Sequence, residues 1–182
     1  MNKHNLLIST ALRCGAAKAA VITREQFVLN ADFRAMCASN QCGLYGRCWQ
    51  CPPDIGEIEP LMQKVLEYPY GMLYQTISSI EDSFDIEGMQ AASRAHAKLS
   101  RKLQKELKDL FTGDVLHLSS GGCKMCDTCA KRDNLPCRQP ELAMSSMEGY
   151  GFDVYNTTKH TDLKYINGQN TVTYFGIVLF TE

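Results

Sequence analysis

Apolar residues recur at helical spacing in several stretches of the chain. From Ile58 to Leu66 they fall at i, i+3, i+4, i+7 and i+8, the repeat of an amphipathic helix that Pro69 then closes. A longer helix is predicted over 86–111, with Lys and Arg opposite its apolar stripe and Gly113 as its stop. A further helix is predicted over 3–13. The long stripe consists of Met89, Ala92, His96, Leu99, Leu103, Leu107 and Leu110.

Short runs of β-branched and aromatic residues between these helices predict strands. The runs cover 18–23, 71–80, 115–118, 152–155 and 171–180, and the composition of the last run is typical of a central strand. A short helix is expected over 141–148. This order of elements predicts an α/β or α+β fold, in which helices flank a mixed β-sheet, and a single domain over residues 1–182.

Composition and charge narrow the class of protein. Hydrophobic residues make up 45% and charged residues 21% of the 182 residues, as in an ordinary globular protein. The net charge of −1 gives no electrostatic reason to expect nucleic acid or an anionic membrane as a partner. Ser9 and Thr10 interrupt the apolar run near the N-terminus, so no signal peptide is expected. We therefore expect a cytoplasmic protein, where clustered cysteines bind metal more often than they form disulfides.

All cysteines except Cys14 fall in two groups, on loops expected at 37–53 and 121–140. The second group has the spacing C-x2-C-x2-C-x7-C and follows two glycines, which permit positive-φ turns. A C-x2-C-x2-C loop can wrap three corners of a [4Fe–4S] cluster, and cationic neighbours lower thiol pKa values. The familiar ferredoxin run has three residues before its last cysteine, where this loop has seven, so the fourth ligand is the least certain. The group consists of Cys123, Cys126, Cys129 and Cys137, with Lys124, Lys131, Arg132 and Arg138 among them.

The first group has the spacing C-x4-C-x5-C-x2-C and ends in Pro52-Pro53. In bacterial ferredoxins a Cys-Pro of this kind supplies a remote corner of a cluster. The group can complete a site alone, or the loops can exchange ligands, Cys51 completing the site begun by Cys123 and Cys137 the site begun here. We expect two metal sites rather than one. The group consists of Cys37, Cys42, Cys48 and Cys51, with Tyr45 and Trp49 either shielding a cluster or packing on the loop.

Structural zinc is the competing interpretation of these thiols. Zinc sites are usually assembled from two separate cysteine pairs, and Cys126 would have to serve in both pairs of the second group. A disulfide framework is disfavoured because the cysteine count of nine is odd and the spacings are short.

The two loops together resemble a family of uncharacterised, predicted metal-binding proteins of anaerobic bacteria and archaea. The resemblance implies a metal or iron–sulfur protein but no reaction. At Cys48 the chain departs from the family pattern. The resemblance therefore does not imply Cys48 as a metal ligand, although Cys48 stays a candidate cofactor-binding residue. A cysteine of the second group is favoured as the ligand in its place. The matching stretches are Cys37-x4-Cys42-Gly43-x-Tyr45-Gly46-x2-Trp49-x-Cys51-Pro52-Pro53, Gly122-Cys123-x2-Cys126-x2-Cys129, Pro136-Cys137-Arg138-x-Pro140 and Ser146 to Val154.

Other polar residues carry weaker signals. His96 lies on the apolar stripe, so a hydrogen-bonded core histidine is expected. His117 is expected as a plain strand residue, with a place near the metal as the alternative. Glu148 and Asp153 either bind a partner or cap nearby turns.

The sequence therefore predicts a small iron–sulfur protein with one or two [4Fe–4S] clusters that transfers electrons or performs redox chemistry. The alternatives are a structural zinc module for interactions and a metal carrier or redox sensor. No phosphate-binding, hydrolase or dinucleotide motif is present, so catalysis would run through the metal centre. A redox protein or a small molecule is the expected partner, and the oligomeric state is open.

Overall fold

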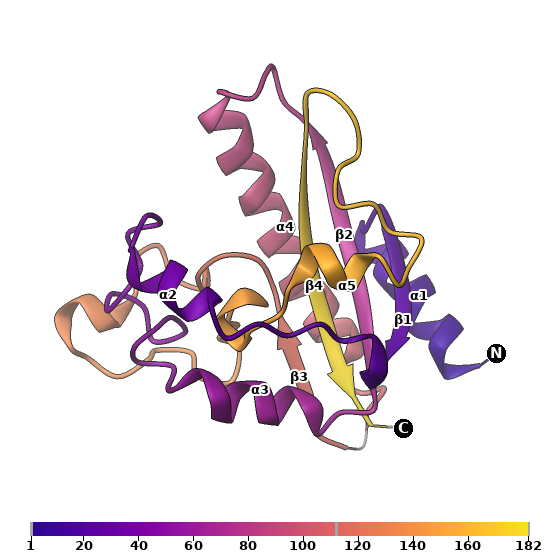
Figure 1. Ribbon diagram of the computed structural model, residues 1–182, viewed down its shortest axis with the longest axis horizontal. Helices are drawn as coiled ribbons and strands as arrows, with labels where there is room; N and C mark the ends of the chain where they lie inside the picture. The colour runs from indigo at the N-terminus through magenta and orange to yellow at the C-terminus, as the bar shows by residue number, and fades with distance from the viewer. Residues whose placement is uncertain (1, 112, 182) are drawn as a thin grey trace.

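A four-stranded sheet with helices packed on both faces forms the body of the protein (Figure 1). This computed structural model describes residues 2–111 and 113–181. The strands are β1 (Lys18–Thr23), β2 (Tyr70–Ser79), β3 (Val115–Leu118) and β4 (Thr171–Phe180). The helices are α1 (Lys3–Cys14), α2 (Phe33–Ala38), α3 (Ile58–Leu66), α4 (Ile86–Leu107) and α5 (Val154–Thr158), with 3-10 turns at Arg24–Gln26, Ala130–Asp133 and Glu148–Tyr150.

The sheet has the strand order β1-β2-β4-β3, and each of its three ladders is antiparallel. The predicted α+β class is confirmed, while the mixed sheet resolves into an antiparallel one. Strands β2 and β4 pair along their whole length, from Tyr70↔Phe180 to Ser79↔Thr171. As predicted, β4 is an inner strand, since β2 lies on one side of it and β3 on the other. Helical and loop segments are packed over both faces, which is why its six last residues are buried.

Side-chain alternation along the strands divides the core between the two faces of the sheet. On one face α1 and α4 cover a cluster that includes Leu7, Leu103, Met72 and Val178. On the other face α3, α5 and the 145–154 segment cover a second cluster. That second cluster includes Val65, Leu73, Phe152, Val154 and Ile177. The two layers hold the sheet rigidly between helices, and the cysteine loops extend from one end of it (Figure 1).

Two predicted elements near the second cysteine loop are wrong. No helix forms over 141–148, because Ser146 makes an isolated parallel bridge to Ser119, the residue that follows β3. No strand forms over 152–155, because the Asp153 side chain accepts a hydrogen bond from the Asn156 backbone N–H at 2.9 Å and caps α5. Asp153 therefore takes the capping role of the two considered for it. The long helix also ends earlier than predicted, at Leu107 rather than near residue 111.

Candidate metal centre

The first cysteine loop begins in the last turn of α2, which holds Cys37, and is then folded by tight turns. Gly43 and Gly46 have φ values of 71° and 66°, which only glycine adopts without strain. The Gly46 N–H donates to the Pro52 carbonyl at 2.9 Å, and the Cys51 N–H donates to the Cys48 carbonyl at 2.9 Å. These bonds bring the ends of the 43–53 segment together and fix Cys48 and Cys51 in one turn.

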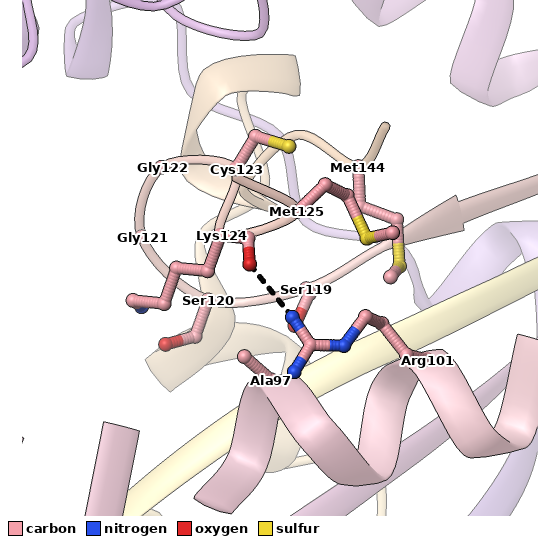
Figure 2. Close-up of a pocket in the computed structure, with 10 residues that line it drawn as sticks. All are labelled: Ala97, Arg101, Ser119, Ser120, Gly121, Gly122, Cys123, Lys124, Met125 and Met144. Atoms are coloured by element: carbon pink, nitrogen blue, oxygen red, sulfur yellow. Dashed lines mark hydrogen bonds between the residues drawn. The ribbon is translucent and has the colours of Figure 1, made fainter. Parts of the chain in front are cut away.

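The second cysteine loop leaves β3 and is anchored to α4 at its start. Figure 2 shows the Arg101 guanidinium reaching from α4 to the Lys124 carbonyl oxygen, a hydrogen bond of 2.6 Å. The Lys124 side chain in turn donates to the Ser93 hydroxyl at 2.8 Å. Further along, Arg138 donates to the Thr128 carbonyl at 3.1 Å. Arg101 and Arg138 therefore brace the loop backbone, and Lys124 ties the loop to α4.

The two loops lie side by side at one end of the molecule (Figure 1). Trp49 is central to this contact, since its indole N–H donates to the Leu135 carbonyl at 2.9 Å. The Lys131 ammonium lies 4.3 Å from the centre of the Trp49 ring and also pairs with Asp54. Of the two roles considered for Trp49, the structure supports packing between the loops.

Cysteines from both loops line one small cavity. Cys48 of the first loop and all four cysteines of the second group contribute to its wall. Cys48 is only 1% exposed, and its thiol lies close to the side chains of Cys51 and Cys129. Cys48 thus places the first loop beside the cysteines of the second group, while the expected exchange of ligands through Cys51 and Cys137 stays a prediction. Spacing gave no signal for this, because Cys48 and the second group lie far apart in the sequence.

The rest of the first group lies next to this cavity. The thiols of Cys37, Cys42 and Cys48 lie near enough to Cys51 to raise its pKa by charge repulsion. A Cβ atom at Gly122 would lie 3.3 Å from the Cys51 sulfur, so the second loop passes directly against Cys51. The carboxylate of Glu148, in the 3-10 turn Glu148–Tyr150, makes a small electrostatic contribution that raises the pKa of Cys37. Cys42 is exposed, whereas Cys37 and Cys51 are partly buried.

Burial and hydrogen bonding set the ionisation of these thiols. The hydrogen bond with Cys51 lowers the pKa of Cys48, while the same bond and burial raise the pKa of Cys51. Burial also raises the pKa of Cys37 and Cys123. The backbone N–H groups of Met125 and Met144 point at the Cys123 sulfur and oppose that rise. Such N–H donors stabilise a thiolate, the form that binds metal.

The donor chemistry fits a thiophilic metal, but the side chains are not gathered into a closed single-ion site. Among residues 2–111 and 113–181, no three His, Cys, Asp or Glu side chains converge as ligands of one ion. The predicted ligand set therefore stays a prediction. Cys14 lies apart in α1, where burial raises its pKa.

The fold and the two facing loops define a small α+β protein with a cysteine-rich candidate metal centre. The sequence model of one family, described as "Predicted metal-binding protein (DUF2284)", matches residues 20–180, and the chain belongs to this family. The match covers all of the sheet except the first two residues of β1, and it covers both cysteine loops. No curated protein and no solved structure matches the chain. None of the helices in the described part of the chain is long and apolar enough to span a membrane.

Proposed function

We propose that the chain is an iron–sulfur protein of the cytoplasm that carries one or two [4Fe–4S] clusters and transfers electrons. The second loop, with Cys123, Cys126 and Cys129 at every third position, would hold the main cluster. Either Cys137 or Cys48 would complete this set. Such a cluster supplies a one-electron redox centre when bound. The host that the family resemblance implies is an anaerobe.

The gathering of Cys48 with all four cysteines of the second group around one cavity carries this proposal. Three cysteines at every third position suit three corners of a cluster, whereas zinc sites are usually assembled from two separate cysteine pairs. The N–H groups of Met125 and Met144 directed at the Cys123 sulfur also suit a cluster, whose potential depends on hydrogen bonds to sulfur.

The surroundings of the first loop support a second site and an approach for a partner. Cys37, Cys42 and Cys51 are mutual neighbours, and the Cys42 side chain is exposed. An exposed ligand edge lets a redox protein or a small substrate come close to the centre. The same exposure favours the rival function of a metal carrier, whose site must release its metal. A zinc-bound interaction module is the remaining rival.

Electron transfer is tested on anaerobically purified protein by stepwise reduction with dithionite, followed by visible absorption and electron paramagnetic resonance. We expect the absorbance of the oxidised cluster to bleach reversibly and a spin signal to appear on reduction. A carrier would instead pass its metal to an apo-ferredoxin within minutes. A protein without visible absorbance and without any reducible signal would refute the electron-transfer proposal.

A further inference from the structure

A second cavity, distinct from the cysteine loops, lies between the C-terminal part of α4 and the edge strand β3. Its volume of about 500 Å³ falls within the range of small-molecule sites in proteins. The wall combines charged, polar and apolar side chains. They include Gln104 and Lys105 of α4, Lys108 directly after its end, His117 of β3, Val178 of β4 and Glu141 from the segment that follows the second loop.

The polar wall of this cavity is built from buried hydrogen bonds. His117 is 9% exposed, and its Nε2 lies 2.8 Å from the Tyr74 hydroxyl. Tyr74 donates its only hydroxyl proton to the Ser100 hydroxyl at 2.7 Å. The His117 Nε2 must therefore carry a proton and donate it to the Tyr74 oxygen. This fixes the tautomer of a neutral His117 and leaves Nδ1 as a hydrogen-bond acceptor.

The acceptor at His117 is available to a ligand. Its Nδ1 makes no hydrogen bond with any residue in 2–111 and 113–181, although the ring lines the cavity. Burial lowers the pKa of His117 to about 3, so the ring is neutral at physiological pH. A neutral ring with a free acceptor selects a ligand that presents an O–H or N–H donor.

The rim of the cavity favours a negative charge. Lys105 and Lys108 are both exposed there, and Glu141 is the single acid that lines the cavity. Neither lysine pairs with a carboxylate elsewhere in the described chain. The remaining wall is apolar and comes mainly from Leu107, Val115, Leu116, Leu142 and Val178. Charge at the rim and apolar surface along the wall match a small amphipathic anion.

We propose that this cavity binds a small organic carboxylate that has an apolar body and an O–H or N–H donor. The carboxylate pairs with Lys105 and Lys108, the apolar body packs on Val178 and its neighbours, and the donor bonds to Nδ1 of His117. The hydrogen-bonded chain continues from Ser100 to the Ser119 hydroxyl at 2.9 Å. Ser119 lies just before the Gly121-Gly122 turn of the metal loop and lines the pocket in Figure 2, so the ligand site and the loop share one rigid network.

The test uses isothermal titration of the purified full chain with three matched probes. They are L-3-phenyllactate, 3-phenylpropionate, which lacks the hydroxyl, and 2-phenylethanol, which lacks the carboxylate. We expect saturable binding of phenyllactate, several-fold weaker binding of phenylpropionate and about tenfold or weaker binding of phenylethanol, since hydrogen bonds to charged groups are the stronger ones.

Two variants separate the cavity from the rest of the surface. The double variant Lys105→Ala/Lys108→Ala should bind phenyllactate about tenfold more weakly. Lys98→Ala, an exposed lysine of the same helix that does not line the cavity, should leave the affinity unchanged. Failure of all three probes to bind, or equal affinity of the double variant and the wild type, overturns the proposal. Neither result bears on the iron–sulfur proposal, which is judged by reduction of the metal centre.

Discussion

Replacement of Cys123 by serine is expected to remove most of the bound metal and to lower the melting temperature of the purified protein. Cys123 lines the cavity where the two loops meet, and two backbone N–H groups already point at its sulfur. A serine hydroxyl is a poor ligand for a thiophilic metal. Changing even an outer partner of a ligand costs about 10–100-fold in metal affinity, so loss of a ligand should cost more.

The measurement is metal content per chain after anaerobic purification, together with the melting temperature. Cys14→Ser is the matched control, because Cys14 lies in α1 outside both loops, and it should retain wild-type metal. Cys48→Ser is the informative companion. If Cys48 is a ligand, Cys48→Ser should lose as much metal as Cys123→Ser does. Retention of metal in Cys123→Ser would contradict the assignment of the second loop.

Acidification from pH 7.5 to pH 5 is expected to lower the free energy of unfolding by about 2 kcal/mol for each of two buried histidines. Burial lowers the pKa of His96 to about 4 and of His117 to about 3, from an ordinary value of 6.5. The positive charge of Lys124 also lowers the pKa of His96, and His96 in turn lowers the pKa of His117. A backbone hydrogen bond at Phe175 raises the pKa of His96 and so opposes the shift.

The sign follows from proton uptake. Below pH 6.5 the unfolded chain protonates both histidines, while the folded chain keeps them neutral until the pH approaches their lowered pKa values. The stability of the folded state is therefore complete above pH 6.5 and is lost as the pH falls toward 4 and then 3. Glu148 works in the opposite direction, because burial raises its pKa and its protonation at low pH removes a penalty.

Urea unfolding at pH 7.5 and pH 5 measures this loss. His117→Gln keeps a donor for the Tyr74 hydroxyl but cannot take up a proton, so it should lose about 2 kcal/mol less on acidification than the wild type. Release of metal is common to both proteins and cancels in the comparison. Identical acid sensitivity of the two proteins would show that His117 is not a buried neutral histidine.

Local patterns were sufficient to predict most of the sheet and its helices. Strand β1 and helix α3 lie at the predicted residues, because a short apolar run marks the first and a period of 3.6 marks the second. His96 is the hydrogen-bonded core histidine that its place on the stripe predicted, with Nδ1 2.9 Å from the Thr76 hydroxyl. The two wrongly predicted elements fall at 141–155, where the Ser119 bridge and the Asp153 cap decide the structure. Ser145 there donates to the side chain and the carbonyl of Gln50 in the other loop.

The candidate site was predictable in its chemistry but not in its connections. Spacing identified Cys123, Cys126 and Cys129 as a metal-binding loop, since those ligands are close in sequence. The place of Cys48 depends on how two loops about 80 residues apart dock, through Trp49 and Leu135. The cavity at His117 also has no local signal, because α4, β3, β4 and the 141–143 segment meet only in the folded chain.

Iron, acid-labile sulfide and zinc should be assayed in protein that is expressed and purified without oxygen. An iron–sulfur centre in the cysteine loops predicts brown protein with equal iron and sulfide, near four of each per chain for one [4Fe–4S] cluster or near eight for two, and little zinc. Colourless protein with stoichiometric zinc and no sulfide would contradict that account.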